Sequence, residues 1–205
     1  MILAESLPQL DVSRETYERL RTLEALTAKW TERINLISRT TRTQIWTRHI
    51  VDSAQLLPLA PRDATFWTDL GSGGGFPGLV LGCLLADRPE GRIVLIESDQ
   101  RKCAFLRTAK RELGIPAQVL AQRIEQAPPA RAQVLTARAL APLSDLLSHA
   151  ERHLAPGGCA LFPKGRTASA EIADARRSWV FDCDETPSIT DPDATLLRIE
   201  RIARA

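Results

Sequence analysis

Residues 69–78 read Asp-Leu-Gly-Ser-Gly-Gly-Gly-Phe-Pro-Gly, and this stretch decides the fold of the 205-residue chain. An apolar segment typical of a buried strand, residues 64–70, leads into it, and an apolar segment typical of a helix, residues 77–85, follows. Glycines at a strand-to-helix turn let the backbone come close to a ligand, and the start of the helix offers free N–H groups. The stretch therefore predicts a ligand-binding loop at one edge of a sheet.

Two nucleotide-binding patterns can be tested against this loop. A P-loop requires Lys and then Ser or Thr after its last glycine, but Leu79 and Val80 follow here, which excludes it. The glycines also match the G-x-G-x-x-G fingerprint of dinucleotide enzymes, and Glu97 lies 19 residues beyond Gly78, near the spacing at which that fold binds a ribose. A dinucleotide site therefore stays open, as does a purely structural turn.

A third pattern, acid-x-Gly-x-Gly-x-Gly, is that of methyltransferases that use S-adenosylmethionine (AdoMet), and the loop fits it with Asp69, Gly71, Gly73 and Gly75. In that pattern the acid that ends the first strand lies near the methionine part of AdoMet. The acid that ends the second strand, here Glu97, accepts hydrogen bonds from both ribose hydroxyls. The loop favours AdoMet over the two alternatives.

Strands and helices alternate on the carboxyl side of the loop. The expected strands span residues 64–70, 92–97, 117–121, 133–137, 159–162, 179–182 and 195–202, and the expected helices span residues 77–85, 100–113, 143–154 and 168–177. Such alternation with short connections predicts an α/β fold, a Rossmann-like class I AdoMet-dependent methyltransferase with a mostly parallel seven-stranded sheet. No helix separates the last two strands, so we expect them to be antiparallel neighbours at the C-terminal end.

Residues 1–60 contain no strand pattern and are expected to form a helical N-terminal extension, with the AdoMet-binding domain at residues 61–205. Ser13 can cap a first helix that has Glu15 in its first turn. A second, shorter helix is expected over residues 43–57, before two prolines.

The composition excludes several classes of protein. A net charge of +2, with 44% hydrophobic and 25% charged residues, indicates an ordinary globular protein and excludes binding of nucleic acid through bulk charge. The four cysteines form no CxxC pair, which argues against a disulfide framework or a zinc ribbon and favours a reducing cytoplasm. The longest apolar run, residues 78–86, is about half of a membrane span, and no signal-peptide pattern precedes it. We expect a cytoplasmic monomer without membrane or metal.

Several segments together resemble one family, the bacterial 16S ribosomal RNA guanine-N7 methyltransferases, also called glucose-inhibited division protein B. The resemblance covers roughly residues 29–165, and the glycine loop combined with the upstream Arg-His-Ile-Val-Asp-Ser segment is its most specific part. The matching segments are residues 35–38, 48–53, 69–78, 95–98, 102–106, 123–125, 136–139 and 164–165. One departure is Ala132-Gln133, where many members carry an aromatic residue and Asp, and this puts a local contact in doubt.

The resemblance implies which residues hold AdoMet: Gly71, Phe76, Ile124, Glu125 and Arg138. Residues that follow the third and fourth strands lie at the carboxyl edge of a parallel sheet, where ligands of such folds bind. For Glu125 and Arg138 the alternatives are a solvated loop carboxylate and a surface ion pair.

The implied reaction needs no general base, because guanine N7 carries an exposed lone pair. Alignment and exclusion of water can supply most of the rate. We name no certain catalytic residue and take Arg138, His49 and Arg48 as candidates for positioning. Cys103 and Cys159 are expected to be structural and not nucleophiles.

The two remaining histidines, His149 and His153, are four residues apart in a run that is not His-Glu-x-x-His. They are expected to be exposed on a helix and not to bind zinc.

Charge is distributed unevenly along the chain. Residues 29–48 hold five bases and one acid, residues 101–123 hold six bases and one acid, and residues 182–193 hold five acids and no base. A charged run is usually a solvated face, but two basic windows beside a ligand edge suit RNA phosphates. The RNA-binding candidates are Arg39, Arg42, Arg48, Arg101, Lys102, Arg123 and Lys164.

The expected partner is 16S ribosomal RNA in the small ribosomal subunit. Two alternatives remain: a non-catalytic RNA-binding assembly factor on the same fold, and a methyltransferase for small molecules.

Overall fold

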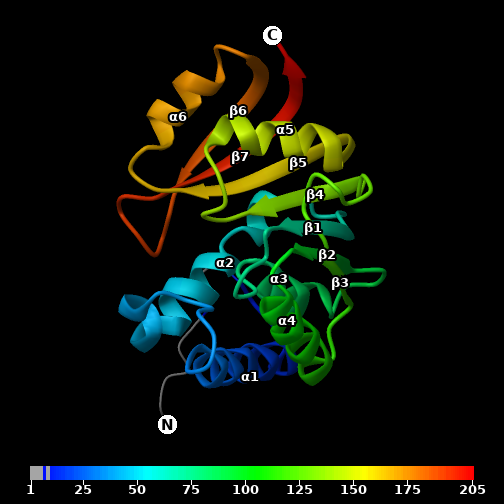
Figure 1. The fold of residues 1–205 in the computed structure, drawn as a ribbon, viewed down its shortest axis with the longest axis vertical. Coiled ribbons are helices and arrows are strands. Elements are labelled where there is room, and N and C mark those ends of the chain that lie inside the picture. Colours follow the sequence, from blue (N-terminus) through cyan, green and yellow to red (C-terminus); the bar gives the residue numbers. More distant parts are fainter. Residues whose placement is uncertain (1–6, 8–9) are drawn as a thin grey trace.

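A seven-stranded sheet forms the centre of the computed structural model, which describes residue 7 and residues 10–205 (Figure 1). The strand order is β3-β2-β1-β4-β5-β7-β6. The strands are β1 (Phe66–Leu70), β2 (Arg92–Glu97), β3 (Ala117–Ala121), β4 (Ala132–Ala137), β5 (Leu154–Lys164), β6 (Trp179–Pro187) and β7 (Thr195–Arg204). The first five strands pair in parallel, and β7 is antiparallel to both β5 and β6. The mostly parallel sheet and the antiparallel C-terminal pair are confirmed.

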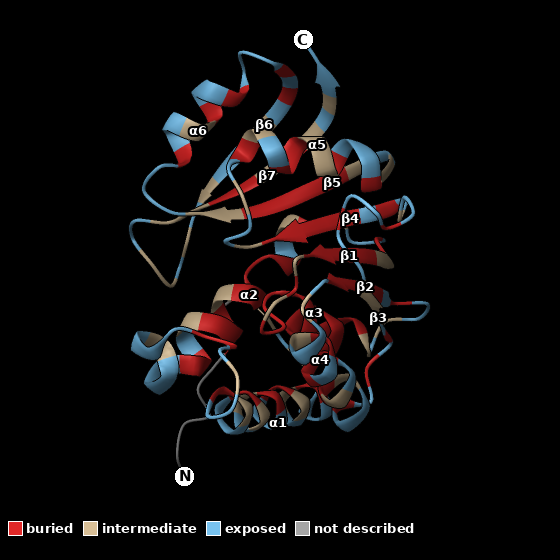
Figure 2. Ribbon diagram, in the orientation of Figure 1, coloured by how far each residue is buried: buried red, intermediate tan, exposed pale blue. Residues whose placement is uncertain are grey.

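Helices cover both faces of this sheet (Figure 1). The α-helices are α1 (Arg14–Thr31), α2 (Asp52–Ala54), α3 (Gly78–Leu85), α4 (Gln100–Leu113), α5 (Leu143–His153) and α6 (Ala168–Ala175). Helices α1, α3 and α4 lie on one side, and α5 and α6 lie on the other. Successive strand residues divide between two buried clusters, since Val134 belongs to the first and Leu135 to the second. This is the alternation that a strand buried on both faces requires, and Figure 2 shows β1 and β4 buried along most of their length.

The N-terminal helices share the core of the sheet. Leu20 and Ile45 lie in the same buried cluster as Trp67 and Leu79. Helix α1 begins at the predicted cap: Ser13 Oγ accepts the N–H of Thr16 at 3.0 Å. A division of the chain at residue 60 therefore remains a proposal about its organisation. Residues 1–6 and 8–9, where a signal peptide was not expected, lie outside the described part.

The second N-terminal helix was predicted incorrectly. In place of one helix over residues 43–57, the chain forms a 3-10 helix η1 (Arg39–Gln44), a π-helix η2 (Trp46–Val51), α2 and a further 3-10 turn η3 (Leu57–Leu59). The π-helical turn places Trp46, His49 and Ile50 on one buried side. Such turns are frequent at functional sites.

Strand β5 begins five residues earlier than predicted. Pro156, Gly157 and Gly158 separate the expected helix over residues 143–154 from the expected strand over residues 159–162, but they lie within β5, where the register against β4 shifts between Ala132 and Val134. Gly157 has φ +75°, so this irregularity places a glycine in the left-handed region. Strands β6 and β7 also run further than predicted, to Pro187 and Arg204.

The departure at Ala132-Gln133 has a structural role of its own. Gln133 Oε1 accepts the backbone N–H groups of Thr65 and Phe66 at 2.8 and 2.9 Å. The amide side chain therefore ties the start of β1 to β4.

Candidate functional site

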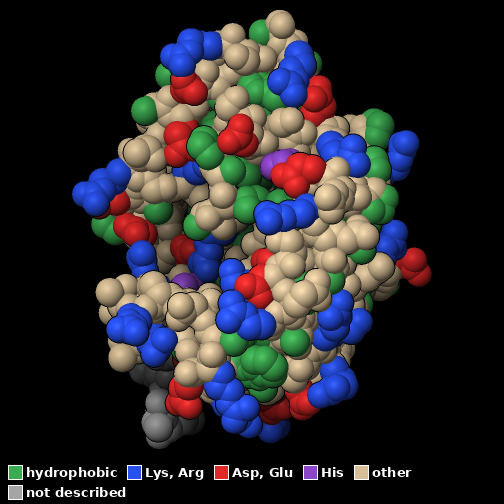
Figure 3. Space-filling model, in the orientation of Figure 1, with side chains coloured by type: hydrophobic (Ala, Val, Ile, Leu, Met, Phe, Trp, Pro, Cys, Tyr) green, Lys and Arg blue, Asp and Glu red, His purple; other side chains and the backbone are tan. Residues whose placement is uncertain are grey.

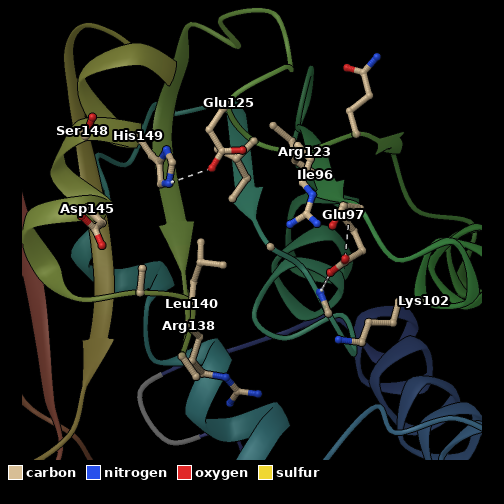
Figure 4. Close-up of a pocket in the computed structure, with 17 residues that line it drawn as sticks. Ile96, Glu97, Lys102, Arg123, Glu125, Arg138, Leu140, Asp145, Ser148 and His149 are labelled. Carbon is tan, nitrogen blue, oxygen red and sulfur yellow. Dashed lines mark hydrogen bonds and ion pairs between the residues drawn. The ribbon is translucent and has the colours of Figure 1, made fainter.

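A cavity of about 630 Å³ opens at the carboxyl ends of β1, β2, β3 and β4 (Figure 4). A volume of this size is typical of a site for a cofactor or substrate. Eight of the predicted site residues line it: Gly71, Gly73, Glu97, Lys102, Arg123, Ile124, Glu125 and Arg138. The structure thus brings together side chains that follow four different strands, as parallel topology predicts.

The glycine loop needs its glycines for two different reasons. Gly71, Gly73 and Gly75 have φ of +60°, +55° and +87°, in the left-handed region that favours glycine. Gly78 has an ordinary backbone conformation, but a Cβ there would lie 2.6 Å from Asp69 Oδ2. The three alternating glycines set the path of the loop, and Gly78 allows α3 to approach β1.

Glu97 is buried, and its carboxylate holds the loop against the end of β2. Its Oε2 accepts the Gly73 N–H at 2.8 Å, and its Oε1 accepts the N–H groups of Ser98 and Asp99 at 2.7 and 2.8 Å. These three backbone donors fix the carboxylate between the glycine loop and the start of α4. Figure 4 shows this side chain at the cavity wall beside Lys102 and Arg123.

Asp69 lies behind the loop and does not line the cavity. It is fully buried, its Oδ1 accepts the Thr136 hydroxyl at 2.7 Å, and its Oδ2 lies against the first turn of α3. Burial raises the pKa of this carboxyl to about 6, although its hydrogen bonds oppose the shift. The position of Asp69 fits support of the glycine loop better than contact with a ligand. Gly75 and Phe76 also lie outside the cavity lining.

The loop that follows β3 is tied down by α5. His153 was predicted to be exposed, but it is fully buried. Its Nδ1 accepts the Ala130 N–H at 3.4 Å and its Nε2 donates to the Ile124 carbonyl at 3.2 Å. Desolvation lowers the pKa of His153, which favours the neutral ring that these two bonds require. This histidine therefore fixes the segment that presents Ile124 and Glu125 to the cavity.

His149 is half-buried and lines the cavity, with its Nε2 3.8 Å from Glu125 Oε1 (Figure 4). Asp145 and Ser148 line the same wall. No sequence motif points to these three residues. Only their position in the fold could have pointed to them. Helix α5 starts a few residues after β4, so the face of α5 that carries them lies at the carboxyl edge of the sheet.

Arg138 lines the cavity, and its guanidinium is directed toward the N-terminal helices (Figure 4). Its Nη1 donates to Asp52 Oδ2 at 3.0 Å, and its Nη2 lies 2.9 Å from His49 Nδ1. The guanidinium also lies 5.6 Å from the centre of the Phe76 ring. Asp52 belongs to the Arg-His-Ile-Val-Asp-Ser segment, and its role as the carboxylate partner of Arg138 was not predicted.

His49 is buried between Arg138 and η1. Because a guanidinium only donates, Nδ1 must accept, and the ring proton sits on Nε2, which donates to Thr41 Oγ1 at 2.9 Å. Burial first, and then the charges of Arg138 and Arg48, lower the pKa of His49 to about 4. The ring is neutral near pH 7 and supports Arg138 from the N-terminal side.

Two other basic candidates are already paired within the protein. Arg48 Nη2 lies 2.9 Å from Asp191 Oδ2 in the loop between β6 and β7. Lys164 is largely buried, and its ammonium donates to the Ala141 carbonyl and to Glu171 at 2.9 and 2.8 Å. Both side chains hold loops together at the sheet edge.

Four of the remaining basic candidates form a groove, whereas Arg123 lines only the first cavity. A second cavity, of about 540 Å³, has Arg39, Arg42 and Arg101 in its wall, and it shares Lys102 with the first cavity. Arg33 adds a fifth base, against two acids, Glu32 and Asp99. The two basic windows of the sequence therefore meet at one surface, and Figure 3 shows basic side chains around the hollow of this face. We call this surface the basic groove.

Comparison with known proteins identifies the family. The family model described as GidB, rRNA small subunit methyltransferase G, matches residues 16–195. The chain belongs to this family. A protein from Cereibacter sphaeroides named ribosomal RNA small subunit methyltransferase G is 53% identical over 204 residues, which cover 99% of each chain. The family confirms the resemblance and the methyltransferase function that it implies, and it disfavours the dinucleotide enzyme and the non-catalytic factor.

Solved structures agree with this fold. A ribosomal protein L11 methylase from Lactobacillus delbrueckii subsp. bulgaricus superposes with a TM-score of 0.60 at 16% identity, over 74% of this chain and 77% of that one. A SAM-dependent methyltransferase from Aquifex aeolicus superposes with a TM-score of 0.56 at 10% identity, over 76% of this chain and 90% of that one. At such identities the likeness concerns the fold alone.

No helix among the described residues is long and apolar enough to cross a membrane. The same residues contain no cluster of three or more His, Cys, Asp or Glu side chains arranged to hold a metal ion.

Proposed function

We propose that this protein transfers the methyl group of AdoMet to N7 of a guanine in 16S ribosomal RNA of the small ribosomal subunit. The observation that supports this proposal best is that the cavity beside the glycine loop and the basic groove adjoin at one edge of the sheet. The cavity with the glycine loop and Glu97 shares Lys102 with the basic groove. A cofactor site that opens beside a surface for phosphates suits a methyltransferase for RNA.

The residues of the cavity fit AdoMet. Glu97 stands at the end of β2 as an acceptor for ribose hydroxyls, and Gly71 and Gly73 leave room for close approach of the ligand. Ile124 and Glu125 offer an apolar and a polar contact on the β3 side for the adenine. Arg138 and Asp145 lie on the β4 side, where the amino-acid end would be held. In this proposal Asp69, Gly75 and Phe76 support the loop from behind.

AdoMet, when bound, supplies an electrophilic methyl group. The protein then has to align guanine N7 with that group and exclude water, because the N7 lone pair needs no deprotonation. His49 is bonded at both ring nitrogens and is neutral, so it serves to position Arg138 and does not take a proton from the substrate. A protein that aligns the two reactants and takes no proton from the substrate suits direct in-line transfer.

The basic groove is the proposed contact for RNA phosphates. Arg39, Arg42 and Arg101 are exposed, as contact with a phosphate backbone requires. Lys102 stands at the junction with the cofactor cavity, where it can contact either ligand, and Arg123 lines the cofactor cavity. Arg48 and Lys164 act through the loops that they hold. A cytoplasmic, monomeric enzyme without a metal remains the expectation from the sequence.

Transfer of a labelled methyl group tests the proposal. Small-subunit RNA from a strain that lacks the gene is incubated with the protein and labelled AdoMet, and AdoMet binding is measured separately by calorimetry. The proposal predicts AdoMet binding and about one methyl group per RNA, with no incorporation into RNA from the parent strain. Binding of AdoMet without incorporation into RNA would point to a small-molecule substrate, and absence of binding would point to a non-catalytic factor.

A further inference from the structure

A cavity of about 750 Å³ lies beside the cofactor cavity, and the proposed function leaves it without a role. The two cavities share one wall, the segment Arg138, Ala139, Leu140 and Ala141 that joins β4 to α5. Its other walls come from the end of β5, from α6, and from the loop between β6 and β7. We call this space the acceptor cavity.

The strand order places the acceptor cavity on one particular side of the cofactor. Ile124 follows β3, Glu97 ends β2 and Arg138 follows β4, so a ligand centred at Glu97 points one end toward β4. The acceptor cavity continues from β4 to β5 and β7. A nucleophile must come within about 3–3.5 Å of the atom that it attacks, so its site must adjoin the β4 end of the cofactor cavity.

The charges of this cavity fit a neutral base and not a phosphate. Three basic residues, Arg48, Arg138 and Lys164, are matched by three acidic ones, Asp52, Glu171 and Asp191. The basic groove has five bases against two acids. The charges therefore favour RNA phosphates at the basic groove and an uncharged, extruded base in the acceptor cavity.

Leu140 supplies an apolar surface where the two cavities meet. It is 36% exposed, one of three large hydrophobic side chains that are exposed in the described part of the chain. The preceding residue, Ala139, has φ +51°, which is unusual for a residue other than glycine. An exposed leucine held by such a turn suits packing against the flat face of a base.

Asp191, in the loop between β6 and β7, supplies hydrogen-bond acceptors in the same cavity. Its Oδ2 accepts from Arg48 at 2.9 Å and its Oδ1 accepts the Asp193 N–H at 3.0 Å. An ionised carboxylate has about four lone-pair sites, so about two remain for a ligand. Guanine presents two donors, N1–H and N2–H, on its Watson–Crick edge, whereas adenine presents an acceptor at N1.

We propose that the acceptor cavity receives the guanine base of the substrate, with Leu140 against its face and Asp191 accepting from its Watson–Crick edge. This inference rests on the proposed function and adds the specificity determinant for guanine. Recognition through the Watson–Crick edge leaves N7, on the opposite edge of the purine, free to face the methyl group.

The test uses RNA in which the mapped target nucleotide is either guanosine or inosine, which lacks the 2-amino group. We expect the wild-type protein to prefer guanosine by about tenfold in kcat/KM, and Asp191→Asn to reduce that preference to about one while AdoMet affinity stays unchanged. Asp193→Asn is the matched control, because it removes the same charge from the same loop outside the cavity. Equal wild-type rates on the two RNAs would overturn the inference, as would an unchanged preference in Asp191→Asn.

A steric test does not depend on Asp191. Ala194→Trp places a bulky side chain in the cavity wall and is expected to lower kcat/KM for RNA by at least a hundredfold with AdoMet binding intact. Asp193→Trp is the control and should stay within about threefold of the wild type. Full activity of a folded Ala194→Trp variant rejects the acceptor cavity. A wild-type protein that methylates no guanine rejects the proposed function itself.

Discussion

His49→Asn tests the network that joins the N-terminal helices to the sheet edge. In the folded protein His49 Nδ1 accepts from Arg138 and Nε2 donates to Thr41, so the ring must be neutral. Burial and the two neighbouring arginines lower its pKa from 6.5 to about 4. The unfolded chain therefore binds a proton more readily than the folded protein between these two values, and the unfolding free energy falls as the pH falls through this range.

The magnitude follows from the two pKa values. The loss attributable to His49 reaches about 2 kcal/mol at pH 5 and about 3 kcal/mol below pH 4. Asp69 acts in the opposite direction, because its folded-state pKa of about 6 lies above its ordinary 3.8, so its protonation favours the folded state as the pH falls from about 6 to about 4. The pH dependence of the wild type alone therefore mixes two effects.

The assay is urea unfolding of the wild type and His49→Asn at pH 7.5 and pH 5. Both proteins contain Asp69, so the difference between their unfolding free energies isolates the histidine. We expect the wild type to be more stable at pH 7.5, and its advantage to shrink by about 2 kcal/mol at pH 5. An advantage that is the same at both pH values would refute the assignment of a neutral, buried His49.

Three further predictions concern the site. Gly73→Asp is expected to reduce AdoMet affinity by at least a hundredfold in calorimetry, because it places a second carboxylate next to Glu97 in the cavity; an unchanged affinity contradicts the placement of the cofactor. Arg138→Ala is expected to lower the rate of methyl transfer about a hundredfold while circular dichroism shows the fold intact. Turnover at the wild-type rate would show that Arg138 has no role in the site. Arg101→Ala should weaken RNA binding and lower the slope of log affinity against log salt by about 1. A slope equal to that of the wild type would mean that the RNA phosphates do not bind at the basic groove.

The sequence predicted the sheet well because its strands are buried on both faces. Segments such as residues 92–97 and 132–137 are short, apolar and bounded by turn residues, and each is a strand within a residue of its predicted limits. Strand β5 was predicted less well. Pro156 and Gly157 are typical of a turn that reverses the chain, but they are equally compatible with a bulge inside a strand. Local sequence does not distinguish these cases, because pairing with β4 decides between them.

The cofactor cavity was largely predictable because a parallel sheet collects the carboxyl ends of its strands. Gly71, Glu97 and Arg138 follow from that rule and from the motifs that carry them. The direction of a side chain does not follow from it. Arg138 was expected to face the cofactor, yet its guanidinium turns to His49 in the π-helical turn and to Asp52 at the start of α2, and the sequence did not predict this break in the helix.

Tertiary packing determines the positions of the residues that the sequence did not predict. His153 has the spacing of an exposed helix residue but is buried by the loop after β3. Asp191 stands in an acidic run that reads as a solvated face, and only the fold brings it to Arg48, far away in sequence. Contacts between distant segments carry no local signal, so no motif could have found this pair.

The identity of the modified atom decides whether this protein is a guanine-N7 methyltransferase. Small-subunit RNA from a strain without the gene is methylated by the protein, digested to nucleosides and analysed by mass spectrometry, and the intact RNA is treated with borohydride and aniline, which cleave at N7-methylguanosine. We expect one N7-methylguanosine per RNA and cleavage at one position. A methyl group on an exocyclic amine, a ribose or a pyrimidine carbon, with no cleavage, would contradict it.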